Sequence, residues 1–125
     1  MTTLLLVALG SALGAPARYL LDRFIQGPHQ RVLPWGTWTV NITGSLLLGL
    51  LFGLASRTGL DQRVLVAVGT GFLGSYTTFS TFTWETVRLI EDRAYLAALA
   101  NLTFSLAAGP AAVSAGVALG MLWAG

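Results

Sequence analysis

The chain has 125 residues, of which 54% are hydrophobic and only 10% are charged. Soluble domains carry about 25% charged residues, so this chain has too little charge to cover a soluble surface, and its long apolar blocks predict an integral membrane protein. Its positive charge comes from seven arginines near the ends of those blocks, a placement typical of membrane-flank anchors rather than of a nucleic-acid surface, and the lack of cysteine excludes disulfides and thiolate chemistry.

The first apolar block predicts a membrane span over about residues 3–24, followed by a polar break over residues 26–31 that holds the only histidine, His29. The block lacks a basic region before it and a convincing cleavage site, so we expect a retained span rather than a signal peptide. Arg18 lies near the end of this span, four residues before Asp22. Two roles stay open for Arg18, because it could add positive potential at a pore mouth or pair with Asp22 while reaching the membrane surface.

The second span is predicted over about residues 34–56, and the turn at residues 57–59 ends it. It carries Thr37, Asn41 and Ser45 at a spacing of four residues. This spacing places all three polar side chains on one face of a helix.

The third span is predicted over about residues 64–90, and a polar stretch at residues 74–82 interrupts it in the middle. A glycine and a run of hydroxyl side chains should break the helix at a depth where unpaired backbone groups are most costly. Membrane proteins tolerate such a break only where it is buried in protein or lines a cavity. The break is therefore a candidate ion or substrate site.

The fourth span is predicted over about residues 94–123, with Asn101 and Ser105 one helical turn apart. Three spans with aligned polar faces beside a broken helix favour a polar pathway through the bundle. The alternative for each polar residue is a simple hydrogen bond between helices. Four tryptophans lie near predicted span ends and are expected to anchor the chain at the membrane surface; they are Trp35, Trp38, Trp84 and Trp123.

Glycine pairs at a spacing of four residues recur in three spans, at 10 and 14, 49 and 53, and 116 and 120. Such pairs let helix backbones approach closely in lipid. Four short helices bury little surface among themselves, so we expect a homo-oligomer, with a dimer as the first choice. Two arginines flank one side of the predicted bundle, Arg57 and Arg63, and four flank the other, Arg23, Arg31, Arg88 and Arg93. This tally favours an outside N-terminus but leaves insertion in both orientations open.

The deep polar groups are neutral donors, and no acidic residue lies deep in a span; Glu85 lies towards the end of the third span, where Arg88 could pair with it. Hydroxyl and amide donors beside phenyl ring edges suit a small anion better than a cation. A proton-coupled multidrug exporter would need a carboxylate inside a span, and a non-transporting assembly subunit would not need the broken helix. No nucleophile–base pair or metal-ligand cluster indicates an enzyme, and nothing indicates nucleotide binding.

The segment over residues 71–85, GFLGSYTTFSTFTWE, closely resembles the signature of the Fluc (CrcB) fluoride channels. Residues 10–19 (GxxxGAxxRY) and 34–49 (PxGTxxxNxxGSxxxG) resemble the first and second spans of that family. The resemblance implies an all-α protein of four spans that lies in the bacterial inner membrane and exports fluoride passively. It further implies a dual-topology antiparallel homodimer with two fluoride pores and a structural sodium ion at its centre.

The resemblance also implies roles for individual residues. The main-chain carbonyls of Gly74 and Thr77 match those that hold sodium. The fluoride pathway would be lined by Asn41, Phe79, Ser80, Thr81 and Phe82. Glu85 matches an acidic position near the pore end whose role is left open, and Arg18 matches the arginine of the first span.

Overall fold

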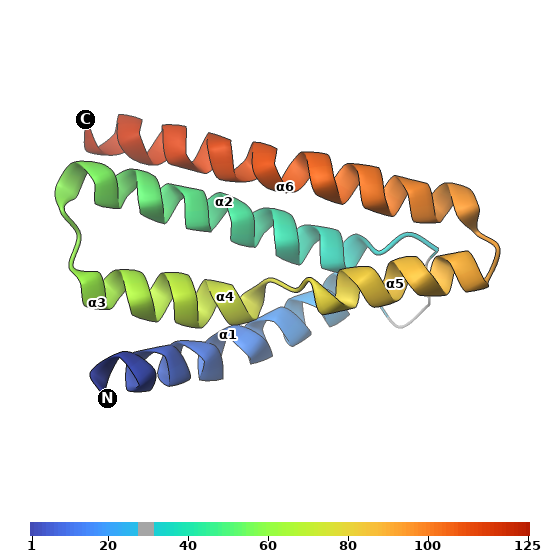
Figure 1. Ribbon diagram of the computed structural model, residues 1–125, viewed down its shortest axis with the longest axis horizontal. Coiled ribbons are helices and arrows are strands. Elements are labelled where there is room, and N and C mark those ends of the chain that lie inside the picture. The colour runs from blue at the N-terminus through green and yellow to red at the C-terminus, as the bar shows by residue number, and fades with distance from the viewer. Residues whose placement is uncertain (28–31) are drawn as a thin grey trace.

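The protein is a bundle of long antiparallel helices, described by a computed structural model over residues 1–27 and 32–125 (Figure 1). Every element within those two ranges is helical, so the all-α prediction is confirmed. His29 and Arg31, which entered the sequence interpretation, lie outside the described residues. Consecutive columns of the bundle run in opposite directions, and both termini lie at the same end (Figure 1).

The bundle has four columns, each corresponding to one predicted span. The first, second and fourth columns are single helices, and the third column is built from several short ones. The elements in chain order are α1 Thr2–Gln26, α2 Trp35–Thr58, α3 Gln62–Val64, η1 Leu65–Leu73, α4 Gly74–Tyr76, α5 Ser80–Glu91 and α6 Tyr95–Ala124. Helices α1, α2 and α6 are each long and apolar enough to cross a membrane, with a mean hydropathy of 1.6. Their outward leucines are largely exposed, as expected for side chains that face lipid rather than water.

Helices α2 and α6 pack with their backbones almost in contact. Gly49 and Gly53 of α2 face Gly116 and Gly120 of α6, and a Cβ added to any of the four would run into the backbone of the opposite helix. The glycine pairs predicted from the sequence therefore lie at the contact between α2 and α6, because the absence of side chains lets the helices approach.

Helix α1 makes a similar contact with η1. A Cβ on Gly10 would meet the backbone of Ala67 and Phe72, and one on Gly14 would meet the Phe72 carbonyl and the Ser75 hydroxyl. The η1 segment has wide π-helical turns, and the N–H of Gly74 reaches back five residues to the carbonyl of Gly69. The sequence pattern did not predict this widening, since apolar periodicity does not distinguish a π-helix from an α-helix.

The third column breaks at Thr77–Phe79, between α4 and α5, as the thin yellow stretch of Figure 1 shows. Thr77 has extended backbone angles, with φ −79° and ψ 159°. The break is shorter than the predicted stretch of residues 74–82, because Gly74 keeps helical angles and α5 begins at Ser80. The prediction of a helix broken in the middle of the third span is confirmed.

The membrane-surface role predicted for Trp38 is wrong. Its side chain is only 8% exposed, whereas those of Trp84 and Trp123 are 59% and 87% exposed. The indole N–H of Trp38 donates a buried hydrogen bond of 2.7 Å to Oδ1 of Asn101 on α6. A partner deep in the bundle therefore outweighs the preference of tryptophan for the membrane surface.

Candidate functional site

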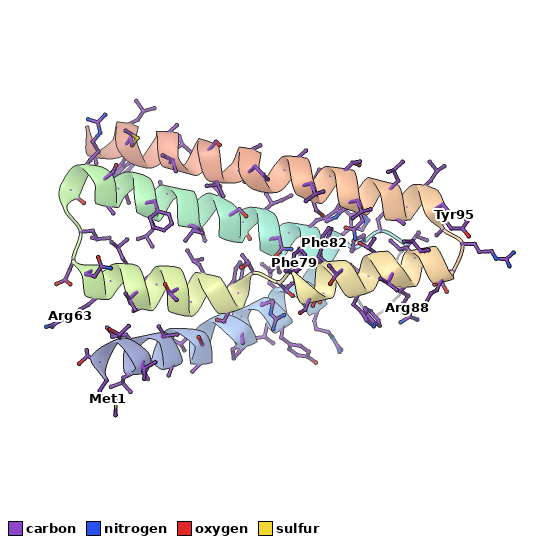
Figure 2. The ribbon with its side chains drawn as sticks, in the orientation of Figure 1. Met1, Arg63, Phe79, Phe82, Arg88 and Tyr95 are labelled. Carbon is purple, nitrogen blue, oxygen red and sulfur yellow. The ribbon has the colours of Figure 1, made fainter. Side chains whose placement is uncertain are left out.

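A groove of about 320 Å³ lies beside the break. Helix α2 contributes Asn41, Gly44 and Ser45 to its wall, and α6 contributes Phe104 and Ser105. The third column contributes residues on both sides of the break; they are Gly69, Leu73, Gly74, Thr77, Thr78, Phe79 and Phe82. Figure 2 shows Phe79 and Phe82 together beside the break, near the middle of the long axis. The groove is mostly apolar with a few polar groups, as is typical of sites for small ligands.

The side chain of Asn41 binds the backbone of the break from both directions. Its Nδ2 donates to the Thr78 carbonyl at 2.9 Å, and its Oδ1 accepts from the Thr78 N–H at 2.7 Å. A side-chain amide has one carbonyl and two N–H groups, so this pairing uses the carbonyl and leaves one N–H beside the groove. Asn41 thus replaces two hydrogen bonds that Thr78 loses where the helix ends.

The hydroxyl of Thr78 binds the first turn of the next helix, α5. Its Oγ1 accepts from the N–H of Thr81 at 3.1 Å and donates to Thr81 Oγ1 at 3.0 Å. Phe79 at the N-cap position has no side-chain cap, and the Thr78 hydroxyl one residue earlier binds the free N–H instead; an N-terminal cap of this kind contributes about 1 kcal/mol. Thr78, for which the sequence predicted no separate role, therefore joins the break to α2 through its backbone and to α5 through its hydroxyl.

These two arrangements leave particular carbonyls without their helical donors. In an uninterrupted helix the Gly74 carbonyl would accept from the N–H of Thr78, and the Thr77 carbonyl would accept from the N–H of Thr81. Here the first N–H donates to Asn41 and the second to the Thr78 hydroxyl. The carbonyls of Gly74 and Thr77 are the two oxygens that the sequence resemblance assigned to a cation, and both residues line the groove.

Helix α2 braces the residues just before the break. Gly44 faces Thr77 and the ring of Tyr76 so closely that a Cβ on Gly44 would run into the methyl group of Thr77. The hydroxyls of Thr43 and Tyr76 form a hydrogen bond of 2.9 Å. Together with Asn41, these residues make α2 the wall that fixes the shape of the break.

The two phenylalanines of the predicted pathway lie side by side but in different surroundings. Their ring centroids are 5.8 Å apart and the ring planes meet at 50°. Phe82 is 6% exposed, whereas Phe79 is 75% exposed although it lines the groove. Phe79 therefore presents a large apolar surface on the open side of the groove.

Four predicted site residues do not line the groove. Ser80 and Thr81 lie on the first turn of α5, where the Ser80 hydroxyl is 3.4 Å from the Thr78 hydroxyl. Arg18 lies on α1, and its Nε is buried without a hydrogen-bond partner in the described chain. Glu85 lies one turn further along α5 and accepts a 2.6 Å hydrogen bond from the hydroxyl of Thr37.

The partner expected for Glu85 is also different. Arg88 was predicted to pair with it, but the guanidinium of Arg88 lies over the ring of Trp84, 5.2 Å from its centroid. A cation over an indole ring is a favourable contact at the membrane surface, and it leaves Thr37 as the neighbour that binds Glu85. The polar face predicted on α2 thus binds two parts of the third column: Thr37 binds α5, and Asn41 binds the break.

Asn101 is not part of an open polar file, contrary to the sequence interpretation. Its side chain is 0% exposed and joins three helices. Its Oδ1 accepts from Trp38 Nε1, and its Nδ2 donates to Thr86 Oγ1 at 2.7 Å and to the Phe82 carbonyl at 3.4 Å. Ser105, one turn further on, does line the groove.

A family model and three curated relatives agree with one another. A family model described as "CrcB-like protein, Camphor Resistance (CrcB)" matches residues 5–117. A Frankia casuarinae protein named "Fluoride-specific ion channel FluC 1" is 49% identical over 120 residues, which is 92% of this chain and 93% of that protein. A Streptomyces avermitilis protein of the same name is 48% identical over 121 residues, covering 96% and 98%. A Geobacter sulfurreducens protein named "Fluoride-specific ion channel FluC" is 44% identical over 108 residues, covering 86% and 87%.

Proposed function

The chain belongs to the CrcB family, and on that premise we propose that it is a multi-pass membrane channel that conducts fluoride passively out of a bacterial cell. The resemblance to this family seen in the sequence is confirmed. The relatives are named as channels, and the chain is not an enzyme. The observation that carries the proposal is the broken third span beside a groove lined by Asn41, Phe79 and Phe82.

The chemistry of the groove suits a small anion. Fluoride is strongly hydrated, so a pore must replace its water with several donors and still release the ion. Asn41 offers one N–H beyond its bonds to Thr78, and phenyl ring edges carry the positive end of the ring quadrupole. The described residues that line the groove include no Asp or Glu, which argues against proton-coupled drug export.

We propose that two copies of the chain form an antiparallel homodimer around this groove. Phe79 is 75% exposed at the open side, and a second copy would cover it and complete the pathway. A two-fold axis places the same surface of each copy in contact with the other. Ser80 and Thr81, which lie outside the groove of one chain, would then line the pathway together with residues of the partner.

A structural sodium ion fits the freed carbonyls. Hard cations bind oxygen, and unwound backbone in membrane proteins is a known source of carbonyl ligands for sodium. Gly74 and Thr77 offer two carbonyls per chain, and a second copy would double the set. The described residues contain no cluster of three acidic or imidazole side chains for a metal, so main-chain oxygens are the candidate ligands. The ion would neutralise the partial negative charge of these oxygens at the centre of the dimer.

Removing sodium tests this part of the proposal. Purified protein exchanged into N-methylglucamine buffer should lose thermal stability and dimer content, and sodium should restore both. Potassium at the same ionic strength is the control. Equal stability in all three buffers would contradict a sodium site and would leave fluoride conduction untouched.

The proposed function itself is tested by fluoride efflux from proteoliposomes that contain this chain alone. A fluoride electrode should record rapid efflux once a potassium ionophore relieves the membrane potential, and a chloride electrode should record none above the protein-free background. Drug–proton exchange in place of fluoride efflux would support the multidrug alternative. The absence of both would support a non-transporting subunit.

A further inference from the structure

Helix α5 carries Phe82 but has no glycine at a close contact with another helix. Its twelve residues, Ser80–Glu91, include no glycine, and it follows directly on the break. The close backbone contacts at glycines lie elsewhere, between α1 and η1, between α1 and α2 and between α2 and α6. The orientation of α5 about its own axis, which decides where the ring of Phe82 points, must therefore depend on side-chain contacts.

The most deeply buried of those contacts is centred on Asn101. Its amide has two N–H groups and one carbonyl oxygen, and nearly all of this capacity is used. Oδ1 accepts from Trp38 Nε1 at 2.7 Å and from Ser105 Oγ at 3.3 Å. Nδ2 donates to Thr86 Oγ1 at 2.7 Å, and Thr86 in turn donates to the Phe82 carbonyl at 2.8 Å.

The chemistry of the partners fixes the direction of the amide. An indole N–H can only donate, so the carbonyl of Asn101 must face Trp38 on α2. The Phe82 carbonyl can only accept, so the N–H side must face α5. Neither a carboxylate nor an apolar side chain could satisfy both neighbours, and an unpaired buried N–H or C=O is costly.

We propose that Asn101 is a positioning residue of the pathway, which holds α5, and with it the ring of Phe82, at the groove. The inference rests on the proposed function for its effect on fluoride. Asn101 does not line the groove itself; it acts through Thr86 and the Phe82 backbone on one side and through Trp38, which does line the groove, on the other. Its loss would let α5 rotate and move the Phe82 ring while the glycine-packed helices stay in place.

Fluorine NMR of protein labelled with 3-fluorophenylalanine tests the position of the ring directly. The Phe82 signal is assigned by its absence from Phe82→Ile. Asn101→Leu and the nearly isosteric Thr86→Val should each shift or split this signal, and Thr86→Ser, which keeps the hydroxyl, should leave it in place. Thr103→Val is the matched control on α6, because the Thr103 hydroxyl donates only to carbonyls of its own helix.

Fluoride flux gives the second readout. Asn101→Leu should lower the efflux rate about tenfold, the scale of losing one or two interhelical hydrogen bonds, while Thr103→Val keeps the wild-type rate. The double variant Asn101→Leu/Thr86→Val should lose little more than the stronger single variant, because the two residues act as one unit. If Asn101→Leu does not fold, Thr86→Val and Thr86→Ser carry the test.

An unchanged Phe82 signal in Thr86→Val or Asn101→Leu would overturn the proposal, as would wild-type flux in both variants. The two proposals fail separately. If the wild-type chain carries no fluoride, the proposed function fails, yet the fluorine signal still decides whether Asn101 positions the ring.

Discussion

Before the break in the third span, η1 lies against α1 with Gly10 and Gly14 at the contact, whereas α5 after the break is held by hydrogen bonds between side chains. In the contact between α1 and η1, glycines without side chains let the two backbones touch. The second uses Thr37 and Glu85 at one point and the Asn101 network at another. The third span is therefore held in the bundle by close packing before the break and by side-chain hydrogen bonds after it.

These two kinds of contact have different consequences: one mainly affects whether the protein folds, and the other affects where the pathway side chains lie. Close packing of helices in lipid depends on shape and is lost when a side chain is inserted at the contact. Hydrogen bonds are directional, so they set the rotation of a helix, and each contributes only about 0.5–1.5 kcal/mol. The half that is packed by glycines anchors the break, and the half that is oriented by polar side chains carries Phe79 and Phe82.

Gly14→Leu should have the largest effect of any single change, because it attacks the packed half. The new side chain would meet the Phe72 carbonyl and the Ser75 hydroxyl and push α1 away from the third span. Overpacking costs about 1–3 kcal/mol and more where backbone must move. We expect little or no folded protein by size-exclusion chromatography in detergent.

The control is Gly109→Leu on α6, since a Cβ at Gly109 meets nothing within 4 Å. It should purify as well as the wild type, whatever its effect on the nearby groove. Equal yields of the two variants would show that the close approach of α1 and η1 does not matter for folding.

Phe82→Ile should have the next largest effect, on flux rather than on folding. The ring is buried in the half held by polar contacts, and isoleucine keeps its apolar character while removing the ring edge. We expect fluoride efflux to disappear while the protein elutes as the wild type does. Phe52→Ile, at an exposed phenylalanine of α2, should retain full flux. Wild-type efflux from Phe82→Ile would refute the role of the ring edge.

Asn41→Leu should weaken the junction between the two halves. It removes both hydrogen bonds to Thr78 and leaves a buried N–H and C=O unpaired, at about 1–3 kcal/mol for each group. We expect a lower unfolding temperature together with reduced flux. Asn41→Asp keeps the acceptor for the Thr78 N–H but turns a second oxygen towards the Thr78 carbonyl, so it should not rescue either property.

Ser45→Ala is the control for Asn41→Leu, on the same face of α2 one turn away. Its unfolding temperature should stay close to that of the wild type. If Asn41→Leu unfolds at the wild-type temperature, the break does not depend on the side chain of Asn41 and the junction is held by other contacts, such as that of Gly44 with Thr77.

The sequence alone predicted the helices that pack through glycines. Glycine spacing and apolar length are local properties, and they predicted the helices and the contacts at Gly10, Gly14, Gly49 and Gly116. The break was predicted as well, since a glycine and a run of hydroxyls mark it, although its extent was overestimated. Gly74 stays helical because its N–H still finds carbonyls in the preceding turns.

The hydrogen bonds that hold the break and α5 could not be predicted in the same way. Thr78 looked like one more hydroxyl, yet its position three residues before Thr81 is a capping pattern that could have been recognised. Trp38 and Asn101, which bind each other, lie 63 residues apart in the chain, and no local pattern pairs them. Directional contacts between distant residues depend on how each helix is rotated, which the sequence leaves open.

Thr37→Val should have the smallest effect and gives the sharpest test of the comparison. Thr37 is 2% exposed, and its hydroxyl donates to Glu85 on α5. Losing this single bond should cost about 1.5–3 kcal/mol, because the acceptor is a carboxylate. Thr39→Val is the control, since the Thr39 hydroxyl donates to the Trp35 carbonyl of its own helix.

A double-mutant cycle of Thr37→Val with Glu85→Leu, measured by thermal unfolding, separates the pair from its surroundings. If α5 is held by several weak directional links, the coupling should stay near the value of one hydrogen bond, and either single variant should still conduct fluoride. A coupling close to zero would mean that the bond at 2.6 Å is incidental. The Asn101 network would then be the main contact that orients α5, and its variants should show the larger loss.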